Sequence, residues 1–215
     1  AGRTALVTGG GTGLGRAMVE TFCALGADAV ICGRREETLA KAAAEIAAAT
    51  GRRVQPVACD VRDADAVDAL AGEACERGCD ILVNNAAANF VARTETLSPR
   101  AFDAIVDISM KGAANATFAC GRRWIADGRG GVVLSIVTSY AWHGSPYVVP
   151  SSMAKAGLLA MTRGLAAEWG PKGIRLVAIA PGSFPTPGAW ERLVPRADLA
   201  ARHETANALG RPGRK

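Results

Sequence analysis

Glycines at three fixed positions near the start of the chain could hold the phosphates of a dinucleotide. They lie in Thr8-Gly-Gly-Gly-Thr-Gly-Leu-Gly15, between an apolar run and a helical pattern. The first can form a tight turn, the second lets the backbone approach a pyrophosphate, and the third lets the next helix pack closely. Free amides at the helix N-terminus would then bind the anionic phosphates. The alternative is a glycine turn with a purely structural role. The residues predicted to contact the cofactor here are Gly9, Gly11, Thr12, Gly13, Leu14 and Gly15.

Charged side chains follow the next two strand-like runs. Arg34 and Arg35 come directly after the second run, where an acidic residue would bind the ribose hydroxyls of NAD. Arginine instead suits the 2′-phosphate of NADP, so this pair favours NADP, with solvated surface arginines as the alternative. Asp60 and Val61 follow the third run, and both are predicted to contact the cofactor. Asp60 could bond the adenine amino group, or it could cap the following helix, and both roles could hold together.

A phenol and a lysine follow the fifth apolar run, and an asparagine-rich segment follows the fourth. A lysine buried near a nicotinamide could hold ribose hydroxyls and lower the pKa of a neighbouring phenol, which makes Tyr140 and Lys155 candidates. The alternatives are a half-buried loop aromatic and a surface helix lysine. The small side chains of residues 84–90 let the backbone pass close to a cofactor, although Asn84 could merely cross-link strands.

Short β-rich runs alternate with longer Ala-rich helical patterns, and this alternation predicts the elements that position these residues. Strands alternating with helices indicate βαβ crossovers and a parallel sheet whose carboxyl ends face one ligand crevice. The sequence therefore predicts one α/β domain, residues 1–215, with a doubly wound parallel sheet. A looser region, 181–209, reads as a lid with a helix over Asp198–Ala208. The predicted strands are Thr4–Thr8, Asp28–Cys32, Val54–Cys59, Ile81–Asn84, Val132–Ile136 and Ile174–Ala180, and the predicted helices are Leu14–Leu25, Glu36–Thr50, Ala64–Arg77, Pro99–Ala126 and Ser152–Trp169.

Composition argues against several classes of protein. The net charge is +5, but the basic residues are dispersed, so we expect no nucleic-acid surface, and the excess favours an anionic ligand. No apolar run approaches the roughly 18 residues of a membrane span. The six cysteines are scattered and lack the spacing of a zinc site, so we expect buried free thiols and no metal.

The motifs together resemble the short-chain dehydrogenase/reductase family. The resemblance rests on Thr8-Gly-x-x-x-Gly-x-Gly15, Asn84-Asn-Ala-Ala, Lys155 and Pro181-Gly182, and it covers nearly the whole chain. It implies a Rossmann-type sheet and a homodimer or homotetramer. It also implies cofactor contacts from Asn85, Pro181, Gly182, Ser183 and Phe184.

Two departures from the family pattern carry further information. The family normally has Tyr-x-x-x-Lys on the helix after the fifth strand, but the tyrosine position here is Ser151, and the asparagine usual in the long fourth helix is Ser109. The chain is similar in these departures to the 2,4-dienoyl-CoA reductase subfamily, particularly its mitochondrial type. Other similar stretches are 84–90, 147–157, 165–170 and 188–193.

This second resemblance implies NADPH-dependent reduction of 2,4-dienoyl-CoA to 3-enoyl-CoA, in the β-oxidation of unsaturated fatty acids. Tyr140 would be the working tyrosine and Asn89 its partner, with Ser151 and Lys155 positioning the donors and the nicotinamide ribose. For Arg62 and Arg192, surface solvation is an equal alternative to a role in substrate binding. The residues implied to contact the acyl-CoA are Arg62, Phe90, Ser98 and Arg192.

Two other functions stay open at this point. The chain could reduce another carbonyl or enoyl substrate with the displaced tyrosine, or it could be a nucleotide-binding subunit without turnover. The second is considered because the chain ends at Lys215, where family members normally continue into one more helix and a final strand. We expect a cytoplasmic protein if the source is bacterial and a mitochondrial matrix protein if it is eukaryotic.

Overall fold

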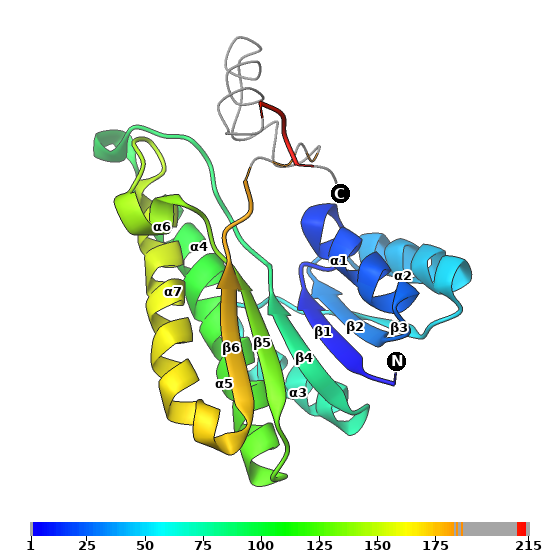
Figure 1. Ribbon diagram of the computed structural model, residues 1–215. Coiled ribbons are helices and arrows are strands. Elements are labelled where there is room, and N and C mark those ends of the chain that lie inside the picture. The colour runs from blue at the N-terminus through cyan, green and yellow to red at the C-terminus, as the bar shows by residue number, and fades with distance from the viewer. Residues whose placement is uncertain (1, 183, 185, 187–209, 214–215) are drawn as a thin grey trace.

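Six parallel strands form one sheet at the centre of the protein (Figure 1). The computed structural model describes residues 2–182, 184, 186 and 210–213. The strand order is β3-β2-β1-β4-β5-β6, the order of a Rossmann-type sheet, so the predicted α/β doubly wound fold is confirmed. The strands are β1 (Thr4–Thr8), β2 (Asp28–Gly33), β3 (Val54–Ala58), β4 (Cys79–Asn84), β5 (Gly131–Ile136) and β6 (Ile174–Ile179).

Helices cover both faces of the sheet, as the right-handed crossovers between parallel strands require. Helices α1 (Gly13–Ala24) and α2 (Glu36–Thr50) lie on one face, and α3 (Ala64–Glu76), α5 (Gly112–Ala126) and α7 (Val149–Trp169) lie on the other (Figure 1). Shorter segments complete the described chain: α4 (Pro99–Val106), α6 (Tyr140–His143), the 3-10 turns η1 (Thr94–Thr96) and η3 (Gly170–Lys172), and the π-helical turn η2 (Asp107–Lys111).

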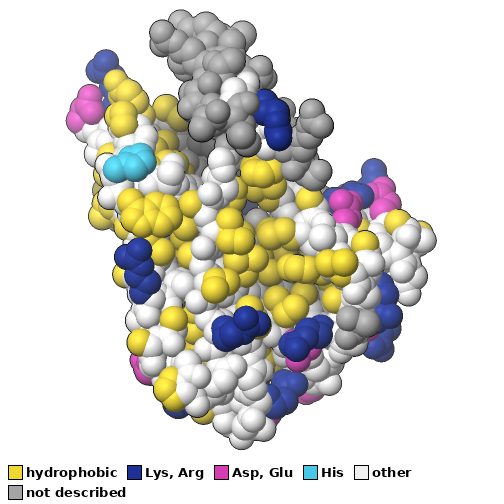
Figure 2. Space-filling model, in the orientation of Figure 1, with side chains coloured by type: hydrophobic (Ala, Val, Ile, Leu, Met, Phe, Trp, Pro, Cys, Tyr) yellow, Lys and Arg dark blue, Asp and Glu magenta, His cyan; other side chains and the backbone are white. Residues whose placement is uncertain are grey.

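The central strands are buried on both faces, which explains their unbroken apolar runs. In β1, Leu6 belongs to the core under α3 and α5, while Val7 belongs to the core under α1 and α2. The outer strand β6 is less covered, and its Val177 and Ile179 are 48% and 51% exposed. Figure 2 shows apolar side chains gathered over β4, β5 and β6 on the face that α1 and α2 leave open.

Two predicted helices and one predicted loop differ from the structure by more than two residues. The helical stretch predicted over Pro99–Ala126 is not one α-helix, because the π-turn η2 interrupts it. Helix α7 begins at Val149, earlier than predicted. Pro150 is tolerated in the first turn, because backbone N–H groups there have no partner within the helix and proline lacks one. The short helix α6 stands where the apolar pattern predicted no element.

Most of the predicted lid lies outside the described residues, as do the helix expected over Asp198–Ala208 and the candidates Ser183 and Arg192. Within the part of the chain that is described, no helix is both long enough and apolar enough to span a bilayer. All six cysteines are free thiols.

Candidate functional site

The glycine-rich turn follows β1 and leads into α1. Gly9 has φ +67°, a conformation that side chains other than glycine rarely adopt, and its N–H donates to the carbonyl of Cys32 at 2.8 Å. A methyl group at Gly15 would overlap the carbonyl oxygen of Gly9. The close approach predicted for Gly15 is therefore confirmed, although its neighbour is the turn itself rather than the sheet.

Asn85 ties this turn to the loop after β4. Its side-chain amide donates to the carbonyl of Thr8 at 2.9 Å, and its backbone N–H donates to the Thr8 hydroxyl at 3.0 Å. The Thr8 hydroxyl in turn donates to Val83 at 3.2 Å. Asn85 thus supports the glycine-rich turn, and its hydrogen bonds join the two loops at the carboxyl ends of β1 and β4.

Asn84 is fully buried and does not cross-link two strands. Its amide donates to the hydroxyl of Thr117 at 2.8 Å, so it joins β4 to helix α5. The alternative of a cross-link between strands is therefore wrong, because the side chain points toward the helical layer rather than along the sheet.

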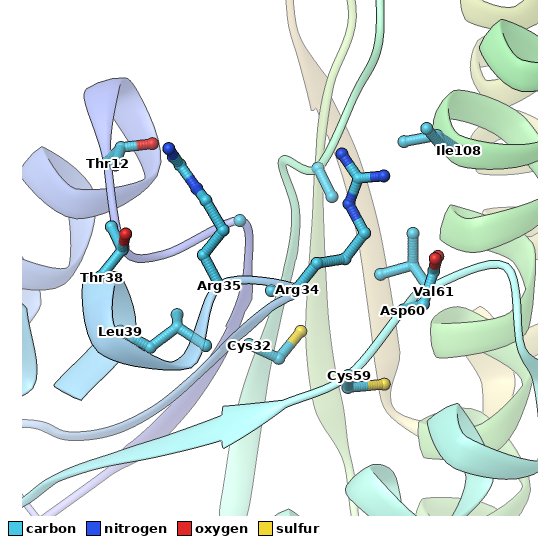
Figure 3. Close-up of a pocket in the computed structure, with 14 residues that line it drawn as sticks. Thr12, Cys32, Arg34, Arg35, Thr38, Leu39, Cys59, Asp60, Val61 and Ile108 are labelled. Atoms are coloured by element: carbon cyan, nitrogen blue, oxygen red, sulfur yellow. The ribbon is translucent and has the colours of Figure 1, made fainter.

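A pocket opens beside the glycine turn, at the carboxyl ends of β1, β2 and β3. Figure 3 shows Arg34 and Arg35 rising from the turn after β2, Arg35 toward Thr12 and Arg34 toward the side of Val61 and Ile108. Neither arginine forms a salt bridge with a described residue, so both guanidinium groups can receive an anion. The predicted cofactor residues that line this pocket are Gly9, Gly11, Thr12, Arg34, Arg35, Asp60 and Val61.

Asp60 lies on the rim of this pocket and is paired with Arg62. The carboxylate accepts from the Arg62 guanidinium at 3.0 Å and from its backbone N–H at 3.1 Å. These hydrogen bonds, together with the charge of Arg34, lower the pKa of Asp60 below its ordinary value. Asp60 does not cap α3: the cap is Asp63, which accepts from the N–H groups of Asp65 and Ala66.

Three candidate residues meet at the phenol of Tyr140: Tyr140 itself, Asn89 and Ser151. The amide nitrogen of Asn89 donates to the Tyr140 hydroxyl at 3.1 Å, and the Ser151 hydroxyl lies 3.3 Å from it. Asn89 comes from the loop after β4, Tyr140 from the start of α6, and Ser151 from the first turn of α7. The structure therefore brings together residues that lie 51 and 11 positions apart in the chain.

Lys155 lies one helical turn after Ser151, on the same face of α7, and is 4% exposed. Its Nζ donates to the carbonyl of Ile136 at 2.6 Å, at the end of β5. Burial lowers the pKa of Lys155 to about 8, because the charged ammonium loses its hydration. The alternative of a surface helix lysine is wrong.

The π-turn η2 positions the loop that carries Asn89. Ser109, inside this turn, is fully buried, and its hydroxyl accepts from Ala88 N–H at 3.0 Å and donates to Ala88 O at 3.2 Å. Asn115 likewise donates to Val61 O at 3.0 Å. A serine in place of the family's asparagine thus holds the backbone directly beside Asn89. Such π-turns often occur at functional sites.

The remaining predicted contacts fall into separate groups. Ser98 caps α4 by accepting from Ala101 N–H at 3.2 Å, so its hydroxyl already has a structural partner. Phe90 is half-buried beside Asn89. Leu14 lies in the first turn of α1 and Gly13, with φ +58°, opens that helix. Pro181, Gly182 and Phe184 follow β6.

Two hydroxyl residues near the site were not singled out from the sequence. Thr138 follows β5, two positions before Tyr140, and its hydroxyl is buried without a partner among the described residues. Thr186 is buried and stands 3.9 Å from where a side chain at Gly13 would begin. The only sequence signal for Thr138 was its place after a strand, and Thr186 carried no signal, because its contact depends on how the chain folds back over the glycine turn.

Comparisons with known proteins show where similar chains occur. The family model described as short chain dehydrogenase matches residues 3–194. An uncharacterized oxidoreductase of Caenorhabditis elegans is 50% identical over 196 residues, which cover 89% of this chain and 62% of that protein. A protein of the same organism, named "Probable 2,4-dienoyl-CoA reductase 3 [(3E)-enoyl-CoA-producing]", is 44% identical over 99% of this chain and 70% of its own length. The chain thus spans less than two thirds of the first of these relatives.

Solved structures give the same family. A short chain dehydrogenase from Bacillus anthracis superposes with a TM-score of 0.87 at 36% identity, covering 99% of this chain and 83% of that one. A metagenomic short-chain oxidoreductase in complex with NADP superposes with a TM-score of 0.79 at 31% identity, covering 85% of this chain and 83% of that one.

Proposed function

The chain belongs to the short-chain dehydrogenase family, and on this premise we propose that it is an oxidoreductase that reduces a 2,4-dienoyl thioester of coenzyme A with NADPH. The observation that carries the proposal is the contact between Asn89 and the Tyr140 hydroxyl at 3.1 Å. A simple carbonyl reductase of this family would use a tyrosine at position 151, where this chain has a serine. The relatives named as dienoyl-CoA reductases support the substrate class.

The cofactor pocket fits a dinucleotide that carries an additional phosphate. The glycine turn offers backbone amides at the start of α1, and two guanidinium groups without salt-bridge partners among the described residues reach into the pocket from Arg34 and Arg35. Such cations pair well with a 2′-phosphate. NADPH bound here would supply the hydride, and the similar structure in complex with NADP supports this choice.

Tyr140 and Asn89 act on the thioester oxygen. When hydride reaches the far end of the diene, negative charge moves through the conjugated system to that oxygen. Two donors placed side by side can stabilise the charge, and each such donor commonly contributes about 2.7–4 kcal/mol. A proton from water then adds to the alpha carbon. The product is a 3-enoyl thioester that carries the hydride at the far end of the former diene and the proton at the alpha carbon.

Ser151 and Lys155 position these donors. Ser151 stands beside the Tyr140 oxygen on its α7 side, and Lys155 is held at the end of β5 by its bond to Ile136. With its pKa at about 8, Lys155 is mostly protonated at neutral pH and can donate to the hydroxyls of a nicotinamide ribose. The two residues therefore orient the phenol and the cofactor without taking the place of the donors.

The decisive assay follows NADPH oxidation with a 2,4-dienoyl thioester of coenzyme A, and compares it with simple ketones. We expect turnover on the dienoyl thioester. Tyr140→Phe should lower that turnover at least tenfold and by as much as about a thousandfold, with NADPH binding retained, because one donor to the developing charge is lost. No activity of the wild-type protein on the dienoyl thioester would refute the proposed reaction.

Cofactor preference is tested by replacing the two pocket arginines. Arg34→Ala and Arg35→Ala should each raise the dissociation constant for NADPH about tenfold or more and leave that for NADH nearly unchanged, since only NADPH carries the 2′-phosphate. Lys41→Ala serves as a matched control, because Lys41 is an exposed cation of α2 that does not line the pocket. An equal rise in the dissociation constants for NADPH and NADH would show that the arginines do not recognise the 2′-phosphate.

A further inference from the structure

Tyr147 has a strained backbone beside the site. It is the one residue other than glycine with a positive φ, +65°, among those that the structure describes. For a residue with a side chain, this left-handed conformation costs roughly 1–2 kcal/mol, and glycine would avoid the cost. Strained positions of this kind cluster at ligand sites, which suggests a functional reason for a side chain at this position.

Two contacts on the C-terminal side of Tyr147 hold its backbone in place. The carbonyl of Tyr147 accepts from the N–H of Ala92 at 2.9 Å, and Val148, the next residue, is buried and accepts from Ser152 in the first turn of α7. The Tyr147–Ala92 bond joins the loop after β4 to the loop before α7. These are the same two segments that supply Asn89 and Tyr140.

Packing of the Tyr147 ring does not offset the cost of the strained backbone, because the ring is not buried in the core. It is 54% exposed, although a buried aromatic side chain would stabilise the fold far more. Val91, adjacent to the bonded Ala92, and Trp142, on α6, are also exposed apolar residues of these two segments. Three large apolar side chains of these two segments are thus exposed to solvent.

We propose that Tyr147 is a specificity-determining residue, whose exposed ring, with Val91 and Trp142, forms an apolar wall for the hydrocarbon chain of the acyl thioester. This inference rests on the proposed function. The occupant follows from position: a thioester oxygen held by Asn89 and Tyr140 directs the rest of the acyl group out between the same two loops. An apolar chain that passes the ring is removed from water on that side, which favours longer acyl groups.

The test compares two dienoyl thioesters of coenzyme A, one with six carbons in the acyl group and one with ten. Tyr147→Ala should raise KM for the longer substrate about tenfold, as expected for losing the burial of one or two methylene groups, and leave kcat and the short-chain KM nearly unchanged. Tyr147→Phe should behave like the wild type, because the wall needs the ring and not the hydroxyl. Leu25→Ala, an exposed apolar residue at the end of α1, is the control and should change neither KM.

Tyr147→Gly separates contact with substrate from support of the fold. Glycine relieves the strain and removes the ring, so its midpoint of unfolding should be no lower than that of Tyr147→Ala, while its long-chain KM should rise equally. If Tyr147→Ala or Tyr147→Gly keeps the wild-type ratio of the two KM values, the apolar wall is refuted while the proposed reaction stands. If the wild-type protein reduces neither thioester, the proposed reaction itself fails, and the inference fails with it.

Discussion

The burial of Lys155 makes a prediction that does not depend on any substrate. The perturbation is Lys155→Met, which keeps most of the length of the unbranched side chain and removes its ionisable amine. Lys155 is 4% exposed, and burial lowers its pKa from 10.5 to about 8. The wild-type protein without bound cofactor should therefore respond to alkaline pH in a way that the variant does not.

The sign follows from proton binding in the two states. Between pH 8 and 10.5 the unfolded chain keeps the proton on Lys155 and the folded chain has lost it, so the unfolded state binds more protons. The free energy of unfolding then rises with pH across this window. Below pH 8 both states are protonated, and the full penalty of burying the charge is present in the fold.

The magnitude comes from the size of the shift. Lowering the pKa from 10.5 in the unfolded chain to about 8 in the folded chain corresponds to about 3 kcal/mol. The bond from Nζ to Ile136 O persists across the window, because a neutral amine still donates. Subtracting the free energy of unfolding of Lys155→Met from that of the wild type at each pH removes the contributions of the other titrating groups.

The assay is urea unfolding of the wild type and Lys155→Met at several pH values from 7 to 10.5, followed by circular dichroism. The stability of the wild type relative to the variant should be flat below pH 8 and should rise by about 3 kcal/mol by pH 10.5. Lys172→Met, at an exposed lysine, is the control and should stay parallel to the wild type. Parallel profiles for Lys155→Met and the wild type would refute the inference that this lysine is desolvated.

Two further substitutions test residues that support the site. Gly15→Ala should lower the free energy of unfolding by about 1–3 kcal/mol and weaken NADPH binding, because its methyl group would overlap the turn after β1. The control Gly164→Ala, in a helix with open space around it, should be neutral or stabilising. Calorimetry measures the stability of each variant, and a fluorescence titration measures its affinity for NADPH. Ser109→Ala should cost about 1–3 kcal/mol in urea unfolding, since Ala88 N–H loses its buried partner, and should lower turnover because the loop carrying Asn89 loosens; unchanged values would assign the loop's position to other contacts.

Much of the fold could be read from local patterns. The apolar runs that became β1 to β6 and the Ala-rich stretches between them depend on periodicity and on glycine and proline signals, which act between near neighbours. The same locality made the glycine turn from Gly9 to Gly15 recognisable. Two boundaries do not follow from periodicity. Helix α7 begins before Pro150, ahead of the apolar pattern, and the π-turn around Ser109 has no periodic signature of its own.

Tertiary structure decided which residues meet. Asp60 could serve adenine or cap a helix from its sequence position alone, and only the fold shows that Arg62 takes its carboxylate while Asp63 provides the cap. From its sequence position Lys155 could equally lie on the surface, and only the packing of α7 against β5 shows that it is buried. Burial and pairing depend on elements that arrive from elsewhere in the chain, so no local pattern determines them.

The sequence by itself determined that this chain forms a parallel α/β sheet with a glycine-rich turn after its first strand, because strand and helix preferences and glycine conformations are set by sterics within a few residues. It also showed that a serine stands at position 151 and a tyrosine at position 140. Only the tertiary structure decided that Asn89 reaches Tyr140, and that Tyr147 is strained against Ala92. Both contacts join loops far apart in the chain, and they exist because β4 and β5 pair side by side and bring the segments that follow them to one edge.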